Sequence, residues 1–215
     1  MSDDAPPPVF HVKHSSKALV DVSRETLAAL EAYVALLLRW NRKINLISRG
    51  DEALVWDRHI ADSVALVSFL PAEFSHAIDI GSGGGLPGVV LAIVTGRPFH
   101  LIESDQRKAA FLREAARELA LPITVHATRV EAAHPPPAPV ITARAVAPLA
   151  TLLAWATPHL APGGFCLFPK GRTVNDELTA AGLEWQMDVV ATPSPTDPTA
   201  RILRISEIAR VGFQP

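Results

Sequence analysis

Apolar side chains recur at helical spacing in two stretches near the start of the chain. Over residues 23–40, leucines and valines return every three or four positions, with Ser23 at the expected N-cap and Glu25 in the first turn. A second stretch with this spacing covers residues 51–69 and ends before a proline. We expect two helices, which form a helical cap over residues 15–70.

After residue 71 the pattern changes to short apolar runs that alternate with longer helical ones. Such alternation is typical of a parallel sheet covered by helices on both faces. The expected strands are Ala77–Ile80, Phe99–Glu103, Ile123–His126, Val140–Ala143 and Phe165–Lys170, and the expected helices are Leu86–Thr95, Gln106–Ala120, Val146–His159 and Val174–Ala181. The sequence therefore predicts an α/β core over residues 71–215.

The last part of the chain has a different pattern. Two β-like runs, Trp185–Val190 and Arg201–Ile208, are joined by the proline-rich segment 192–198, which predicts an antiparallel return. Together the patterns predict a Rossmann-like α/β fold: a mostly parallel seven-stranded sheet with an antiparallel last strand, plus the N-terminal cap. An antiparallel last strand is a topological clue toward methyltransferases.

Length and composition fit a single domain spanning residues 1–215. The 215 residues are 48% hydrophobic and 20% charged, as in an ordinary globular protein. Residues 1–14 are acidic at the start and proline-rich, without the features of a signal peptide, and we expect a loose tail there. Because no apolar run approaches the roughly 20 residues that span a bilayer, we expect no membrane contact.

Cysteine content and net charge limit the kinds of site and partner that the protein can have. Cys166 is the only cysteine, which excludes an internal disulfide and a cysteine-clustered zinc site and favours a cytoplasmic setting. We expect no metal. The net charge of −2 means that any nucleic-acid contact must come from a local basic patch. The compact chain with its small cap is expected to be a monomer.

The segment Asp79–Gly88 follows an apolar strand and predicts a strand, a glycine loop and a helix. Gly81, Gly83 and Gly85 allow a sharp turn and a close approach to a ligand, and Pro87 suits the first turn of the helix. A dinucleotide fingerprint also fits the loop, on Gly83, Gly85 and Gly88. The glycines alone therefore leave NAD and other cofactors open.

Asp79 helps to choose among these cofactors. A carboxylate at the tip of the strand would repel a pyrophosphate, whereas S-adenosylmethionine has no phosphate and carries an ammonium and a sulfonium group. Glu103 follows the second strand, about 20 residues after the loop, where an acidic side chain can accept both ribose hydroxyls. That position serves NAD and S-adenosylmethionine equally, and a solvated strand-end carboxylate is the alternative.

Basic and other polar residues are concentrated in two segments of the cap, 39–49 and 56–63. Basic and amide groups interleaved with tryptophan suit phosphate contact and base stacking. The candidate RNA-binding residues are Arg42, Lys43, Asn45, Arg49 and His59. In the alternative interpretation, the cations complement a helix dipole, Trp40 and Trp56 lie in the core, and His59 is structural.

Five polar or glycine-containing motifs follow one another along the chain: Asn41–Leu46, Arg58–Ser63, Asp79–Gly88, Thr142–Ala145 and Phe168–Gly171. In order and spacing they resemble the bacterial glucose-inhibited division protein B family of small-subunit rRNA guanine-N7 methyltransferases. The resemblance runs from about residue 23 to the C-terminus. It implies a class I methyltransferase that uses S-adenosylmethionine and acts on the guanine at position 527, in the 530 loop of 16S rRNA, in free rRNA or in the small ribosomal subunit or its precursor.

The resemblance also implies site residues. Cofactor contacts are expected from Gly81, Leu86, Val130, Glu131 and Arg144. The chain departs from the family in its proline-rich loop 135–139 and in Pro169, which precedes Lys170.

Guanine N7 carries a lone pair and no proton, so its methylation needs no general base. We therefore expect no catalytic dyad, and we expect catalysis by alignment and by tolerance of the positive charge that moves to the base. Arg144 and Lys170 follow or end strands and can hold the guanine O6 or a phosphate. As an alternative, both seal a strand edge.

Two functions of other classes stay open. An NAD-dependent oxidoreductase is supported by the glycine pattern and Glu103, but it lacks a proton-relay constellation. A non-catalytic RNA-binding or ribosome-assembly module would keep the fold without turnover. Among methyltransferases, a small-molecule or protein substrate is a further alternative.

Overall fold

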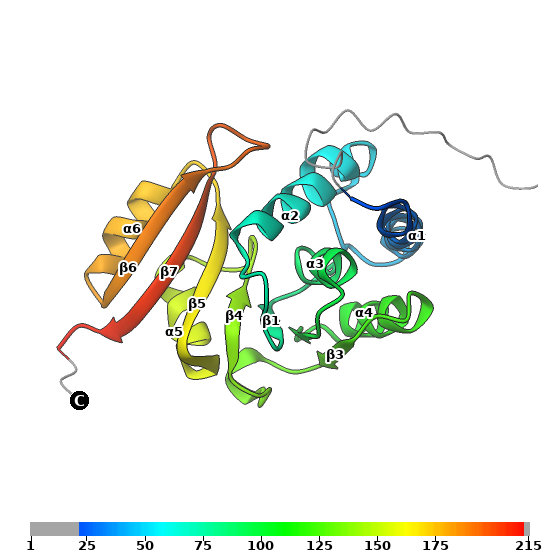
Figure 1. The fold of residues 1–215 in the computed structure, drawn as a ribbon. Helices are drawn as coiled ribbons and strands as arrows, with labels where there is room; N and C mark the ends of the chain where they lie inside the picture. The colour runs from blue at the N-terminus through cyan, green and yellow to red at the C-terminus, as the bar shows by residue number, and fades with distance from the viewer. Residues whose placement is uncertain (1–21, 213–215) are drawn as a thin grey trace, which may run out of the picture.

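The computed structural model describes residues 22–212, and the first helix begins near the start of this range (Figure 1). The tail expected over residues 1–14 and the first residues of the expected cap lie outside it. Helix α1 spans Arg24–Asn41, and the Ser23 hydroxyl accepts the Thr26 N–H at 3.2 Å. The first helix and its N-cap are thus confirmed.

The second helical stretch is less regular than its apolar spacing predicts. It consists of η2 (Arg49–Leu54), η3 (Trp56–Ile60), α2 (Ala61–Ala65) and η4 (Leu66–Phe69), which are a 3-10, a π, an α and a 3-10 segment. The Ser63 hydroxyl donates to the His59 carbonyl at 2.7 Å, one turn back, and side chains that bond in this way bend helices. The spacing identified the apolar face and could not identify these changes of pitch.

The sheet has seven strands in the order β3-β2-β1-β4-β5-β7-β6. The strands are β1 (Ala77–Ile80), β2 (Phe99–Ile102), β3 (Ile123–His126), β4 (Ala138–Thr142), β5 (Leu160–Lys170), β6 (Trp185–Pro193) and β7 (Arg201–Arg210). Strand β7 pairs antiparallel with both β5 and β6, and the first five strands pair in parallel. The predicted sheet, with its antiparallel last strand, is confirmed.

The remaining helices follow the expected βα series with small shifts. They are α3 (Gly88–Thr95), α4 (Gln106–Glu118), α5 (Leu149–Ala156) with the 3-10 turn η6 (Thr157–His159), and α6 (Val174–Gly182); a short turn η5 (Val130–Ala132) follows β3. Pro87 and Pro148 each occupy the N-cap, so α3 and α5 start later than the apolar runs indicated. Pro87 therefore precedes the first turn rather than lying in it.

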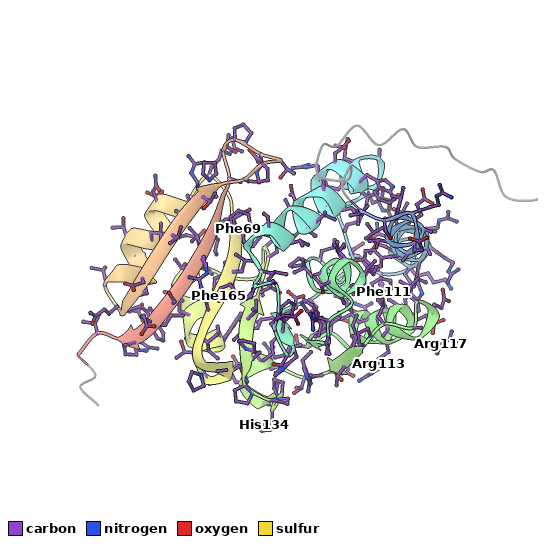
Figure 2. All side chains as sticks on the ribbon, in the orientation of Figure 1. Phe69, Phe111, Arg113, Arg117, His134 and Phe165 are labelled. Carbon is purple, nitrogen blue, oxygen red and sulfur yellow. The ribbon has the colours of Figure 1, made fainter. Side chains whose placement is uncertain are left out.

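Each face of the sheet has its own hydrophobic core, and in Figure 1 the helices α1 to α4 lie on one side and α5 and α6 on the other. Strand β1 supplies both cores, because Ala77 faces the first and Ile78 the second. Phe111 projects from α4 into the first core and meets Trp40 of α1 edge-on at 5.8 Å between ring centroids (Figure 2). The cap therefore shares a core with the sheet.

No helix within residues 22–212 combines the length and the apolar character needed to cross a membrane.

Candidate functional site

A cleft of about 1330 Å³ runs along the carboxyl ends of the central strands. Its walls are the glycine loop, the cap residues 57–59, the segment 144–148 after β4, the end of β5 and the tip of the β6–β7 hairpin. Pockets for one small molecule usually measure about 300–1,000 Å³. The cleft therefore has room for a cofactor together with part of a second ligand.

The glycine loop forms the floor of the cleft at the end of β1. Its start is fixed by the Gly81 amide, which donates to the Ile102 carbonyl at 2.8 Å. Gly81 has a φ of +65°, and a Cβ there would lie 2.6 Å from Cγ1 of Val146. This position needs glycine for both reasons. Gly81, Gly83 and Leu86 all line the cleft.

Glu103 lies beside this loop, at the end of β2, and is held by the backbone. Its Oε2 accepts the Gly83 amide at 2.8 Å and its Oε1 accepts the Asp105 amide at 2.7 Å. The residue is 7% exposed and lines the cleft. It is therefore not a freely solvated strand-end carboxylate, and each oxygen keeps a second lone pair for a ligand hydroxyl.

Asp79 stands near the end of β1 but does not face a ligand there, as the sequence indicated that it would. Its side chain is fully buried beneath the loop, and Oδ1 accepts the Thr142 hydroxyl at 2.7 Å. Oδ2 lies against Gly88, where an added Cβ would come within 2.8 Å of it. Burial raises the pKa of Asp79 to about 6, and the Thr142 hydroxyl only partly opposes this shift. Asp79 therefore supports the loop from below and does not line the cleft.

Arg144 projects from the end of β4 toward the cap. Its Nη2 lies 3.0 Å from Nδ1 of His59, its Nη1 donates to the Arg58 carbonyl at 3.3 Å, and Oδ2 of Asp62 lies 3.8 Å from Nη1. The side chain is 16% exposed, and burial lowers the pKa of the Arg144 guanidinium. This arginine therefore joins the sheet to the cap inside the cleft.

His59 is held neutral by its surroundings. Burial, followed by the positive charge of Arg144, lowers the pKa of the His59 imidazole to about 4, and Asp51 only partly opposes this. Its Nε2 is buried and lies 3.7 Å from Oδ2 of Asp51, beyond hydrogen-bond reach. His59 lines the cleft, so its position combines contact with Arg144 and access to a ligand.

Asp62 and Thr196 close one end of the cleft. The Thr196 hydroxyl, at the tip of the β6–β7 hairpin, makes a short hydrogen bond to Oδ1 of Asp62 on α2. Burial raises the pKa of Asp62. Sequence reasoning missed this link, although Asp62 lies within the motif Arg58–Ser63; Thr196 stands in a proline-rich loop that carries no pattern.

Lys170 is not the free cation that the sequence predicted. Its ammonium donates to Oε2 of Glu177 at 2.7 Å and to the Ala147 carbonyl at 2.9 Å, and the residue is 8% exposed. The same Glu177 oxygen accepts the Leu149 amide at 2.9 Å. Lys170 thus joins β5, α5 and α6 although it borders the cleft, and the alternative in which it seals a strand edge describes it better.

Four of the five candidate RNA-binding residues of the cap, all except His59, are exposed. The side chains of Arg42, Lys43, Asn45 and Arg49 make no hydrogen bond or ion pair with any other residue from 22 to 212. Asn45 and Arg49 border a hollow of about 540 Å³ formed by residues 45–49. The neighbouring Asn41 has a different role, because its buried side chain accepts the amides of residues 46 and 47 at 2.8 and 3.0 Å.

Val130 and Glu131 lie in η5, after β3, and do not line the cleft. Val130 is buried and its carbonyl accepts from Nε2 of His159 at 3.2 Å, whereas Glu131 is exposed. Pro169 borders the cleft and pairs with Ile202 of β7. Within residues 22–212 no group of three or more histidine, cysteine or acidic side chains is arranged to hold a metal ion.

Comparison with known sequences identifies a family. The sequence model described as rRNA small subunit methyltransferase G matches residues 26–199. A ribosomal RNA small subunit methyltransferase G of Rhodospirillum centenum is 54% identical over 198 residues, covering 92% of this chain and 92% of the relative. The same-named protein of Granulibacter bethesdensis is 56% identical over 190 residues, covering 88% and 89%.

Solved structures are similar in fold at low sequence identity. A cofactor-bound protein from MTB, Rv0187, matches with a TM-score of 0.58 and 12% identity, over 83% of this chain and 89% of that one. The ribosomal protein L11 methylase of Lactobacillus delbrueckii subsp. bulgaricus matches with a TM-score of 0.57 and 16% identity, over 69% and 78%. These likenesses support the class I methyltransferase fold.

Proposed function

Because the chain belongs to the rRNA small subunit methyltransferase G family, we propose that it methylates small-subunit ribosomal RNA with S-adenosylmethionine as methyl donor. The target in this proposal is N7 of the guanine at position 527, in the 530 loop of 16S rRNA. The enzyme acts as a monomer in the cytoplasm.

One observation supports the proposal above all. The glycine loop and Glu103 line the same cleft as Arg144 and His59, which comes from the cap. A methyl donor beside the loop would thus lie in the same cleft as a base that enters from the cap side. The volume of about 1330 Å³ accommodates both.

The residues present fit S-adenosylmethionine. Glu103 offers two oriented carboxylate oxygens to the ribose hydroxyls, and the backbone at Gly81 and Gly83, with Leu86, offers close contact. Asp79 acts from below the loop, through the Thr142 hydroxyl and the packing of Gly88. Val130, Glu131 and Arg144 complete the proposed set; of these, Arg144 lines the cleft, and Val130 and Glu131 lie outside it in η5.

Alignment and charge, rather than proton transfer, carry the proposed chemistry. The bound cofactor supplies a sulfonium methyl, which N7 takes with its lone pair while the C–S bond pair stays on sulfur, so that the positive charge passes to guanine. No proton has to leave N7, and no base is needed. The side chains of Arg144 and neutral His59 hold the wall against which the base aligns.

The cap supplies the proposed RNA contacts. Arg42, Lys43, Asn45 and Arg49 are exposed on the cap, and His59 lines the cleft. Exposed cations without ion-pair partners suit phosphate contact. Lys170 is left out of this set, because Glu177 neutralises it.

The proposal is tested with labelled S-adenosylmethionine and small ribosomal subunits, precursor particles or naked 16S rRNA. Label in the RNA is expected, and calorimetry should show binding of S-adenosylhomocysteine but not of NAD. Binding of NAD alone would support an oxidoreductase. Binding of RNA without any methyl transfer would support a non-catalytic assembly module, and label in protein or small molecules only would refute the RNA substrate.

A further inference from the structure

The only tyrosine of the chain, Tyr33, makes a hydrogen bond to the glycine loop. Tyr33 lies in the middle of α1 and is fully buried. Its hydroxyl makes a short hydrogen bond to the carbonyl oxygen of Gly84, which is 51 positions later in the sequence. A cap helix thus reaches the backbone of the proposed cofactor loop directly.

The cap also packs tightly on this part of the loop. A Cβ added at Gly84 would lie 3.3 Å from Cδ1 of Leu37 and 3.3 Å from the Leu46 carbonyl, both in the cap. A Cβ added at Gly85 would lie 3.1 Å from the Tyr33 hydroxyl. The back of the loop is therefore shaped by the cap, while its front faces the cleft.

Resting on the function proposed above, we propose that Tyr33 is a positioning residue that fixes the glycine loop for the methyl donor. Three consecutive glycines occupy 83–85, and two of them have positive φ. Such a segment has many accessible backbone conformations. The hydroxyl holds the Gly84 carbonyl toward α1, and this restrains the adjoining Gly83, whose amide donates to Glu103.

The C-terminal end of the same helix is capped by Arg42, one of the proposed RNA contacts. Arg42 follows Tyr33 by nine positions, which is about 14 Å along a helix. In this proposal, RNA bound at this end of α1 and a methyl donor bound by the loop are therefore both positioned by the same helix. The cap becomes part of the cofactor site as well as a candidate RNA contact.

Tyr33→Phe tests the proposal, because it removes the hydroxyl and keeps the ring that fills the core. S-adenosylhomocysteine affinity should fall about tenfold, which corresponds to 1.4 kcal/mol, because the unrestrained loop populates the binding-competent conformation less. RNA affinity in the absence of cofactor should change less than twofold. In kinetics the KM for S-adenosylmethionine should rise more than kcat falls.

Thr157→Val is the matched control, because it removes a hydroxyl that donates to the Leu153 carbonyl at 2.7 Å, far from the cleft. It should lower thermal stability without changing cofactor affinity. If Tyr33→Phe also leaves S-adenosylhomocysteine affinity within twofold, the hydroxyl is only a buried structural bond and the proposal is wrong.

A second measurement needs no variant. In protein labelled with 13C-tyrosine, the single ring should give one set of signals that shifts when S-adenosylhomocysteine is added. Binding by calorimetry with no shift would overturn the role of Tyr33 and leave the proposed function intact. If the parent chain does not bind S-adenosylhomocysteine at all, the cofactor assignment fails, and the role of Tyr33 fails with it.

Discussion

Nη2 of Arg144 lies 3.0 Å from Nδ1 of His59, and this contact settles which imidazole nitrogen carries the proton. A guanidinium has only donors, so Nδ1 must accept. The neutral ring therefore carries its hydrogen on Nε2, which faces Asp51 at 3.7 Å. A cation from the sheet and a neutral ring from the cap thus form one wall of the cleft.

This relationship predicts how His59 titrates. Nitrogen NMR of histidine-labelled protein should show one ring that stays neutral, with the Nε2–H tautomer, from pH 8 down to about pH 5. The His59→Asn variant identifies its signal. A ring that takes up its proton near 6.5, the ordinary value, or that carries its hydrogen on Nδ1, would contradict the geometry.

Stability should follow the same titration. The folded pKa of His59 is depressed to about 4, while the unfolded ring has the ordinary value of 6.5. The neutral His59 ring therefore contributes its full stabilisation above pH 6.5. This stabilisation is lost as the pH falls toward 4, because the unfolded chain binds the proton at a higher pH than the folded chain. His59→Asn should flatten this part of the stability profile.

Asp79→Asn should stabilise the fold at pH 8 and have little effect near pH 4. The folded pKa is raised from 3.8 to about 6, so the parent loses stability as pH rises through this range. The shift corresponds to at most about 3 kcal/mol. Chemical denaturation at both pH values measures it, with Thr142→Val as a variant that removes the hydroxyl donor instead. An equal effect at both pH values would contradict the buried, ionisable state of Asp79.

Lys170→Met should lower stability and spare RNA affinity. Removing the ammonium leaves the Glu177 carboxylate without its cation in a largely buried setting, which costs about 2 kcal/mol, between the values for exposed and fully buried pairs. Denaturation and RNA-binding titrations measure the two effects, and Glu177→Gln is the matched partner variant. If Lys170→Met lowered RNA affinity and left stability unchanged, Lys170 would be an RNA contact and its structural role would be refuted.

Replacing Arg42 and Lys43 by alanine should weaken RNA binding about tenfold or more and reduce the salt slope by about two, since two phosphate contacts are lost. Cofactor affinity should not change. The double variant Arg24→Ala and Arg113→Ala is matched in charge; both residues are exposed, and Figure 2 shows Arg113 on α4. Equal losses in both double variants would mean that only net charge matters.

The sheet was predictable because its strands repeat one pattern. Buried parallel strands appear as short apolar runs between helices, and Ala77–Ile80 and Ile123–His126 match the predicted bounds. The pitch changes between residues 49 and 69 were not predictable, since they depend on local hydrogen bonds such as the one from Ser63 to the His59 carbonyl.

The sequence predicted which residues lie near the site, but it did not predict the direction in which their side chains point. Spacing brought Glu103 beside the glycine loop, but it gave Asp79 an access to the ligand that the structure does not give it, and it did not show that Glu177 pairs with Lys170. Side-chain direction depends on neighbours distant in sequence, such as Thr142 and Glu177. The contact between Tyr33 and Gly84, for the same reason, has no signature in the sequence.

Mapping of methylation at nucleotide resolution tests the central claim most directly. Small subunits prepared without this protein are incubated with it and S-adenosylmethionine, and 7-methylguanosine is located by chemical cleavage, with Arg144→Ala as the variant of reduced activity. We predict cleavage at guanine 527 of 16S rRNA that depends on both protein and cofactor. Methylation at another nucleotide, or none in subunits, precursors and naked rRNA alike, would contradict the account.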